Sequence, residues 1–278
     1  MLQSCSPASC RSRGSIVEPL PGLAPWLGGK RQLAKLLTAR IDRLPHRCYA
    51  EPFLGMGGVF LRRRRRAEAE AINDAHGDVV NLFRIVQRHP EALAEALAFT
   101  IAARADFARV RAIDPTRLTD VERAARFFFL MHAGFRGRAK SPTFGASPHR
   151  RSHWHPERLV ARIRAVHRRL AGVYIEKLGY AEFIRLYDGS ETLFYLDPPY
   201  WGHERDYGNG LFARDDFVRL AELLAAIKGR FILSINDVPE IRRLFRWARI
   251  TGAPVTYTIG GGKRVAELVI TSRRSASP

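Results

Sequence analysis

A strand, a glycine-rich loop, a helix and a second strand near the start of the chain limit its fold more than any other feature. The short apolar stretch from Cys48 to Phe53 predicts a buried strand, which runs into the loop Gly55-Met56-Gly57-Gly58. We expect a helix over residues 59–66, ending in a basic run, and a second strand over residues 69–72 that leads to Asp74. This order is typical of α/β sheets that bind nucleotides at the carboxyl ends of their strands.

The remaining sequence divides into more of the same sheet and a different, arginine-rich middle. Apolar spacing predicts further helices over residues 33–41, 78–87 and 214–227, and further strands over residues 173–176, 193–196, 231–235, 255–259 and 267–271. The middle is helical and is interrupted by the irregular stretch 134–154, which is rich in glycine and proline. We therefore expect a disordered leader (1–20), a catalytic α/β domain (21–90 and 172–272), an inserted helical subdomain (91–171) and a disordered tail (273–278).

The run Asp197-Pro198-Pro199-Tyr200 directly follows the apolar strand Leu193 to Leu196. Two consecutive prolines make a rigid turn without backbone donors, which leaves the Asp197 carboxylate and the Pro198 carbonyl as acceptors beside the Tyr200 ring. This set suits an exocyclic amine such as the adenine N6 group, with the two acceptors holding its protons and the aromatic ring stacked on the base. The alternative is an ordinary turn in which Asp197 caps a helix.

The glycine loop and Asp74 together favour a cofactor that contains adenosine. Asp74 lies about 20 residues beyond the loop, where a carboxylate can bind a ribose diol. The loop lacks the full dinucleotide spacing, and glycine turns also occur for packing alone. NAD would be the usual choice for such a pair, but the amine-binding turn at Asp197 argues for a different cofactor.

The balance of charge predicts a polyanionic partner. Lys and Arg total 46 against 27 Asp and Glu, a net charge of +19, and such a field attracts nucleic acid at long range. The alternative is that the positive charge reflects only the arginine-rich helices that high-GC coding tends to produce. An anionic membrane surface is the rival partner, although no segment has the roughly 20 apolar residues of a spanning helix.

Cysteine and histidine placement predicts a reducing compartment and no metal. Cys5, Cys10 and Cys48 form no C-x-x-C pair, and the first residues lack the apolar core of a secretory signal, so we expect a cytoplasmic protein. The histidines of the middle region, at positions 132, 149, 153 and 155, match no zinc spacing.

Seven short motifs, in one order over residues 25–272, resemble the Dam-like class (alpha group) of DNA adenine N6-methyltransferases. They are Trp26-x-Gly28-Gly29-Lys30, Glu51-Pro52-Phe53-x-Gly55-x-Gly57, Ile72-Asn73-Asp74, Gly134-Phe135-Arg136-Gly137, Asp197-Pro198-Pro199-Tyr200, Ser234-Ile235-Asn236-Asp237 and Lys263-Arg264-Val265-x-Glu267-Leu268. Any one motif is weak, but seven in order are specific. The resemblance implies a Rossmann-like methyltransferase sheet with an inserted DNA-recognition subdomain.

The resemblance also implies the ligands and the residue roles. S-adenosylmethionine would donate its methyl group to the N6 amine of an adenine flipped out of double-stranded DNA, and a covalent enzyme intermediate is not needed. The implied cofactor residues are Trp26, Lys30, Phe53, Gly55, Gly57, Asp74 and Asp197. The implied catalytic residues are Asp197, Pro198, Pro199 and Tyr200. The implied DNA-binding residues are Phe135, Arg136, Arg138 and Lys140. A monomer of bacterial or phage type, without a metal, is expected.

Three departures from the family put a GATC target in doubt. Arg136 stands where GATC-reading members have Asn, Pro25 stands where they have a basic residue, and Thr143-Phe144-Gly145 closes a shortened hairpin. Two other functions remain open at this point. One is a methyltransferase acting on RNA adenine or on another amine, and the other is an inactive homologue that binds DNA.

Overall fold

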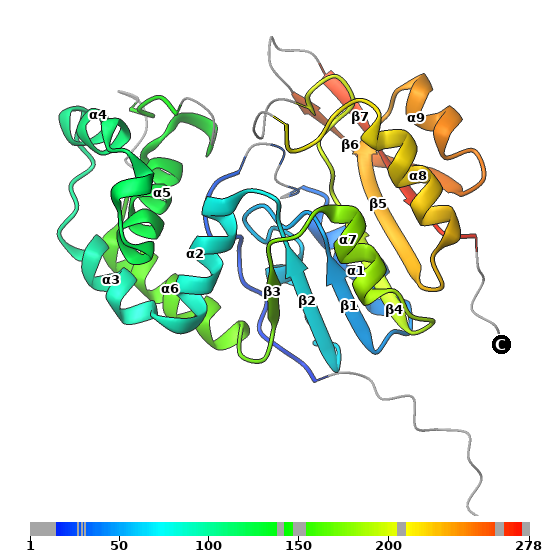
Figure 1. Cartoon of the computed structure of the whole chain (residues 1–278), viewed down its shortest axis with the longest axis horizontal. Coiled ribbons are helices and arrows are strands. Elements are labelled where there is room, and N and C mark those ends of the chain that lie inside the picture. Colours follow the sequence, from blue (N-terminus) through cyan, green and yellow to red (C-terminus); the bar gives the residue numbers. More distant parts are fainter. Residues whose placement is uncertain are drawn as a thin grey trace, which may run out of the picture.

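The computed structural model describes residues 15–26, 28, 30, 32–137, 142–146, 154–204, 210–258 and 264–273. These residues form a seven-stranded sheet with helices on both faces and a group of helices to one side (Figure 1). Within this part of the chain, no helix is long and apolar enough to span a membrane.

The sheet is mostly parallel, with one antiparallel pair at its edge. Its order is β3-β2-β1-β4-β5-β7-β6. The strands are β1 (Cys48–Glu51), β2 (Ala69–Asn73), β3 (Tyr174–Glu176), β4 (Thr192–Leu196), β5 (Arg230–Asn236), β6 (Arg249–Thr258) and β7 (Arg264–Thr271). Strands β1 to β5 pair in parallel, while β7 runs antiparallel to both β5 and β6. The expected α/β class is confirmed, and the C-terminal strands make a hairpin at one edge.

The strand order reverses between β1 and β4. From β1 the chain builds outward through β2 to β3, and it then returns to add β4 on the other side of β1. Ligands of open α/β sheets bind outside the carboxyl ends of the strands at such a reversal. The glycine loop follows β1 and the Asp197 turn follows β4, so the two predicted motifs meet at this point (Figure 1).

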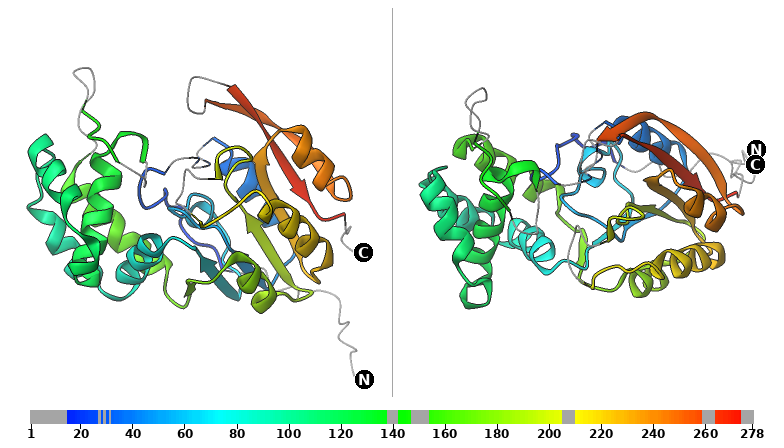
Figure 2. Two further views of the ribbon diagram at one scale, coloured as in Figure 1. Left: turned by 45° about the horizontal axis from the view of Figure 1, so that its top comes forward. Right: turned by 90° about the horizontal axis from the view of Figure 1, so that it is seen from above.

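Alternation along the strands creates one apolar core on each face of the sheet. Tyr49 packs with α1 (Ala34–Arg43), whereas the next residue, Ala50, packs on the opposite face. That second face is covered by α7 (Tyr180–Tyr187), α8 (Asp216–Ala226) and α9 (Pro239–Leu244) (Figure 2). Because successive side chains of a strand point to opposite faces, a strand covered on both sides is buried along its whole length and mostly apolar, as β4 is.

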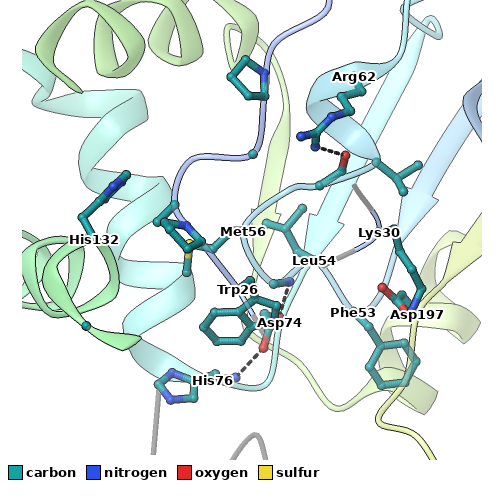
Figure 3. A pocket seen from close by; sticks show the side chains of 18 of the residues that line it. Trp26, Lys30, Phe53, Leu54, Met56, Arg62, Asp74, His76, His132 and Asp197 are labelled. Atoms are coloured by element: carbon teal, nitrogen blue, oxygen red, sulfur yellow. Dashed lines mark hydrogen bonds and ion pairs between the residues drawn. The ribbon is translucent and has the colours of Figure 1, made fainter. Parts of the chain in front are cut away.

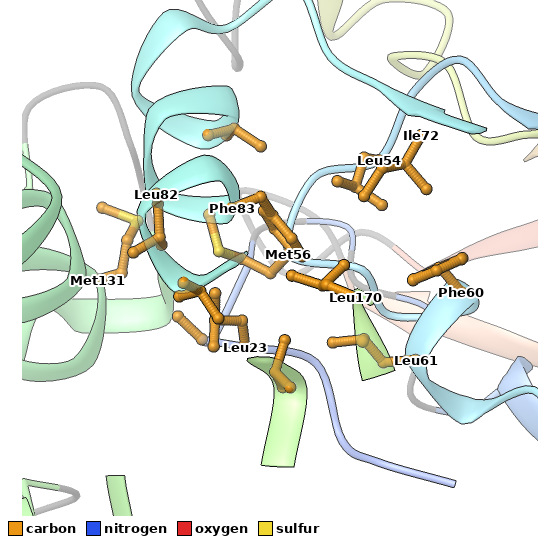
Figure 4. Packing of buried hydrophobic residues seen from close by; sticks show 14 of the residues in the cluster. Leu23, Leu54, Met56, Phe60, Leu61, Ile72, Leu82, Phe83, Met131 and Leu170 are labelled. Carbon is orange, nitrogen blue, oxygen red and sulfur yellow. The ribbon is translucent and has the colours of Figure 1, made fainter. Parts of the chain in front are cut away.

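The middle region forms the helices α3 (Pro90–Ala98), α4 (Arg104–Ala112), α5 (Asp120–Ala133) and α6 (Pro156–Arg169). They pack beside α2 (Gly77–Arg88) on one side of the sheet (Figure 1), with a short 3-10 turn, η2 (Pro115–Arg117), before α5. Figure 4 shows the apolar core continuing from the glycine loop through Phe83 and Leu82 to Met131 of α5. The inserted helices and the sheet therefore share one core, and their status as a separate subdomain stays a prediction.

The helix expected over residues 59–66 is wrong. Only the short 3-10 turn η1 (Phe60–Arg62) forms, and the chain then extends. Ser15 and Val17 exchange backbone hydrogen bonds with Arg64 and Arg66, and Arg63 turns inward to a buried ion pair with Glu70 at 2.7 Å. The basic run 62–66 is therefore extended rather than helical beyond η1. Residues 15–17 pair with its backbone, and the buried Glu70 carboxylate pairs with Arg63.

The same backbone pairing shows that part of the expected disordered leader is ordered. Residues 15–20 are joined to the body by backbone hydrogen bonds to residues 61–66, so a disordered leader over all of 1–20 is wrong for these six residues; residues 1–14 lie outside the described part. Arg273, the first residue of the expected tail, donates to the Arg246 carbonyl at 3.2 Å, and residues 274–278 also lie outside it. Helices α7 and α9 were not anticipated.

Candidate active site

A cavity of about 1,400 Å³ opens at the carboxyl ends of β1, β2 and β4 and extends to the inserted helices. Figure 3 shows Lys30, Phe53 and Asp197 on the sheet side of this cavity and His132 of α5 across from them. Most of the predicted site residues line it together: Trp26, Lys30, Phe53, Gly55, Asp74, Asp197, Pro199 and Phe135. Gly57, Pro198 and Tyr200 are not part of its lining.

The glycine loop is shaped by Asp74 and Trp26. The Asp74 carboxylate accepts hydrogen bonds from the backbone N–H groups of Gly55 and His76, both at 2.8 Å (Figure 3). Gly55 has a φ of +51°, and a Cβ on it would lie 2.7 Å from the indole nitrogen of Trp26. Only glycine allows both the backbone conformation and the close approach of that ring.

Gly57 has a packing role. Its φ is +68°, and a Cβ there would press on the Leu61 side chain at 3.1 Å and on the Phe83 ring at 3.2 Å. The residue therefore faces the apolar core beneath the loop rather than the cavity. Its expected place at the boundary of the cofactor pocket stays a prediction.

Aromatic rings surround Asp74 and the start of the cavity. The His76 ring stacks on Phe127 with centroids 5.6 Å apart, and Trp26 meets both rings edge-on. Phe53 stacks on Tyr180 at 5.6 Å and contacts Phe212 edge-on. Such flat apolar walls, with a carboxylate between them, can hold a purine nucleoside by its ring and its ribose.

The Asp197 turn is held by a buried lysine. The Lys30 ammonium lies 2.6 Å from the Asp197 carboxylate, 3.0 Å from the Tyr200 hydroxyl and 3.1 Å from the Glu267 carboxylate. Lys30 is 2% exposed, whereas Asp197 keeps 22% exposure toward the cavity. Asp197 is thus an ion-paired carboxylate at the cavity wall, and the helix-capping alternative is wrong.

Glu267 is a site residue that sequence reasoning did not single out. It lies on β7 opposite Asn236 of β5, is 1% exposed, and accepts a hydrogen bond from the Tyr200 hydroxyl. Its signal was present in the last of the seven motifs, but a lone acid in a predicted strand has no evident partner. The sheet supplies that partner by placing β7 beside β5.

Tyr200 turns into the protein. Its ring is 6% exposed, the Lys30 ammonium sits 4.5 Å from the ring centroid, and the hydroxyl joins Lys30 to Glu267. The stacking of this ring on a base stays a prediction, and in this geometry the ring packs against the buried charges instead.

Burial and neighbouring charges set the protonation of the cluster. Burial raises the pKa of Asp197 to about 6, with Lys30 opposing the rise and Glu267 adding to it. Burial disfavours the charge on Lys30, but Asp197, Tyr200 and Glu267 outweigh this and hold the pKa of Lys30 well above its usual value. Burial also raises the pKa of Glu51, another cavity residue that was not predicted, to about 8. At neutral pH, Asp197 is therefore a carboxylate and Glu51 is mostly a neutral acid.

Two asparagines fix the turns that carry the site. Asn236, at the end of β5, accepts from the Trp201 N–H at 2.9 Å and donates to the Trp201 carbonyl at 3.1 Å. Asn73, at the end of β2, donates to the Pro52 carbonyl at 3.0 Å. Each side-chain amide makes hydrogen bonds to backbone groups that would otherwise be unpaired in these turns. Both residues therefore hold the turns in place without lining the cavity themselves.

Phe135 stands at the mouth of the cavity, in the 3-10 turn η3 (Phe135–Gly137) after α5, and is 51% exposed. Its N–H donates to the Thr143 carbonyl at 2.7 Å, which joins η3 to the segment 142–146. Gly137 has a φ of +60° and abuts the Pro25 carbonyl, so η3 and the segment before Trp26 touch. Of the predicted DNA-binding residues, the backbone alone is described for Arg136, and Arg138 and Lys140 lie outside the described residues.

Comparison with known proteins places this geometry among DNA-modifying enzymes. Residues 26–259 match the family described as D12 class N6 adenine-specific DNA methyltransferase. The chain is 26% identical to the type II methyltransferase M.CviBI of Paramecium bursaria Chlorella virus NC1A, over 79% of this chain and 84% of that protein. It is 25% identical to the type II methyltransferase M1.LlaDCHI of Lactococcus lactis subsp. cremoris, over 89% and 93% of the two chains. It is 23% identical to the DNA adenine methylase of Haemophilus influenzae, over 84% and 86%.

Proposed function

Because this chain belongs to the D12 class N6 adenine-specific DNA methyltransferase family and is an adenine N6 methyltransferase of DNA, we propose that the Asp197 turn holds the target amine. The observation that carries the proposal is the 2.6 Å ion pair between Lys30 and Asp197 at the wall of the cavity. It keeps a partly buried carboxylate ionised and aimed at the space where a flipped adenine would enter.

The acceptors of the turn determine the direction of attack. The Asp197 carboxylate is bonded to Lys30 and also accepts a hydrogen bond from Ser234. Each carboxylate oxygen has two lone pairs, so Asp197 can still accept one N6 proton, and the Pro198 carbonyl can accept the second. With both protons held, the nitrogen lone pair points away from the turn. The N–C bond forms as the C–S bond of the donor breaks, the electron pair stays on sulfur, and the surplus N6 proton passes to the acceptor side. Positioning supplies most of the rate enhancement in such a reaction.

The sheet side of the cavity fits S-adenosylmethionine. Asp74 would hold the ribose diol, Trp26 and Phe53 would hold the apolar surfaces, and Glu51 with Asp197 would face the cationic end. S-adenosylmethionine, when bound, supplies the methyl group as an electrophilic sulfonium. Since the Lys30 ammonium lies within 3.1 Å of Asp197, Tyr200 and Glu267, we assign Lys30 to positioning the turn rather than to the methionine carboxylate.

The partners follow from the charge and from the relatives. A +19 chain with an exposed Phe135 at the cavity mouth suits double-stranded DNA with an extruded base. Two of the relatives bear the name of type II methyltransferases, which supports a modification enzyme with its own target sequence. We propose that it acts as a monomer in a cytoplasmic compartment.

Replacement of Asp197 tests this role. We expect Asp197→Ala to lower methyl transfer by at least about 100-fold, since losing one preorganised group at a reacting centre typically costs 10²–10³, while S-adenosylmethionine binding persists. The assay follows tritium from labelled S-adenosylmethionine into DNA adenine. Asp215→Ala, an exposed aspartate outside the cavity, is the control.

Two outcomes would contradict the proposal. Full activity in Asp197→Ala would remove the carboxylate from the reaction, and preferential labelling of RNA in competition with DNA would favour the RNA alternative. Sequencing DNA from expressing cells with a modification-sensitive method identifies both the methylated base and its context.

A further inference from the structure

The cavity is larger than its cofactor requires. Pockets for small molecules and cofactors are roughly 300–1,000 Å³, whereas this one is about 1,400 Å³. The sheet side, from Trp26 to Asp197, accounts for the cofactor and the target amine. A second region remains between the glycine loop and the inserted helices, where Figure 3 shows Arg62 and His132.

The two regions differ in their ionisable side chains, with carboxyl groups on one side and basic groups on the other. The acids that line the cavity, Glu51, Asp74 and Asp197, all follow or end strands of the sheet. The region facing the inserted helices is lined instead by basic side chains, among which are Arg62, Arg158 and Arg162. A ligand that spans the cavity would therefore meet acids at one end and cations at the other.

Arg158 and Arg162 are the two arginines of α6 that line the cavity, whereas Arg168 is exposed outside it. Arg169 is bonded to Glu70 at 2.5 Å, and Arg164 forms a bidentate pair with Glu91. Arg158 and Arg162, one helical turn apart, have no carboxylate partner among the described residues. Burial lowers the pKa of Arg162 and no carboxylate offsets this, although a guanidinium remains charged. Both side chains instead line the cavity.

We propose that Arg158 and Arg162 bind the sugar-phosphate backbone of the target strand next to the flipped adenosine. A base that reaches Asp197 stays joined to its two flanking phosphates, so these phosphates must lie within the same cavity or at its mouth. Planar guanidinium groups i and i+4 on one helix can each contact a phosphate. Arg62 faces the same region but already donates to the Gly58 carbonyl at 2.6 Å, so we assign the contacts to α6.

This inference rests on the proposed function, because it names where the substrate of that site is held. It assigns two positioning residues that lie outside the seven motifs. In the sequence of α6, the spacing of the arginines is the only sign of such a role. Phosphate contacts carry no base information, so these residues would strengthen DNA binding uniformly rather than select the target sequence.

The test is the salt dependence of duplex binding. Each phosphate contact contributes about 0.9 to the slope of log K against log salt, so Arg158→Gln/Arg162→Gln should reduce that slope by about 1.8. We expect the KM for DNA to rise while the affinity for S-adenosylmethionine stays within about twofold. The matched control is Arg168→Gln/Arg185→Gln. It removes two exposed arginines that lie outside the cavity and form no ion pair with a described carboxylate, one of them on α6.

The outcomes separate this inference from the proposed function. A slope unchanged from the wild type, or reduced no more than in the control, would overturn it. Weakened S-adenosylmethionine binding with an unchanged slope would also overturn it, because the two arginines would then belong to the cofactor. Failure of the wild-type protein to methylate adenine would reject the proposed function, while the difference in binding slope would still be measurable. Unchanged cofactor affinity also shows that the double variant is folded.

Discussion

Three buried charges control the chemistry at the scale of single residues. Lys30 and Glu267 are almost completely buried, and they meet Asp197 at the cavity wall. Burial is the main reason why the pKa of Asp197 stays above its usual value despite the ion pair with Lys30, and the nearby Glu267 carboxylate adds to the rise. The site thus keeps an acceptor that is ionised at neutral pH but close to its point of protonation.

This predicts a pH dependence. Because burial raises the pKa of Asp197 to about 6, the carboxylate is protonated below that pH and cannot accept the amine proton. Methyl transfer measured in single turnovers should therefore rise about tenfold per pH unit up to about pH 6 and then level off. Glu267→Gln removes a negative charge that raises this pKa, so it should move the midpoint downward. A flat profile between pH 5 and 8, or an upward move, would refute the assignment.

At the scale of elements, α5 connects the core to the cavity mouth. It begins with a capping box, in which Thr119 and Glu122 satisfy each other's backbone N–H groups, and buries Phe127 to Met131 in the shared core. It ends at Ala133 and is followed by Gly134, where a Cβ would lie 2.4 Å from the Leu130 carbonyl oxygen. The helix therefore stops at a defined residue and presents Phe135 directly after it.

Loss of the Thr119 cap should lower the free energy of unfolding by a measurable amount. Thr119→Ala leaves a helix N–H group unpaired, and we expect the free energy of unfolding to fall by about 1 kcal/mol. Thr38→Ala is the comparison, because the Thr38 hydroxyl bonds a carbonyl inside α1 rather than capping a helix, and it should change the same quantity by less than about 0.5 kcal/mol. Urea titration of both variants gives the two values. Equal effects would show that the box does not stabilise α5.

At the scale of the whole molecule, a buried ionic cluster joins the inserted helices to the sheet. Glu70 of β2 pairs with Arg63 at 2.7 Å and with Arg169, the last residue of α6, at 2.5 Å. The guanidinium groups lie over the rings of Tyr49 and Phe60. Burial opposes ionisation of Glu70, but the two arginines lower its pKa overall. One carboxylate thus holds the segment around Arg63 and the end of α6 to strand β2.

Removing that carboxylate should lower the free energy of unfolding substantially. Glu70→Gln leaves two buried guanidinium groups without their counter-charge, and breaking a buried pair in this way costs about 3–5 kcal/mol. Glu91→Gln breaks an exposed pair with Arg164 and should cost less than about 1 kcal/mol. Because the pKa of Glu70 is depressed, its contribution is present above the pKa of the unfolded chain and is lost as the pH falls. Urea titrations at pH 7 measure the free energy of unfolding of both variants. Similar losses in the two would contradict a stabilising role for the buried cluster.

Much of the fold follows from local pattern. The predicted strands and the longer helices are present because alternation and helical spacing depend on which faces are buried, and the sequence records this directly. The order of motifs also predicted that the glycine loop, Asp74 and the Asp197 turn share one sheet edge. Where local pattern failed, at residues 59–66, a tertiary ion pair and a neighbouring segment outweighed helical spacing.

The amino-acid sequence by itself determines the α/β class, the motif order and the D12 family, because these depend on short-range spacing. Pairing between distant residues required the folded chain: Lys30, Asp197 and Glu267 meet because β7 packs beside β5 and because α1 begins near the reversal of strand order. The sequence names Asp197 as an acceptor, but its ion pair, its partial burial and its pKa of about 6 arise only from three-dimensional contact, since electrostatic energies depend on distances that sequence separation does not encode.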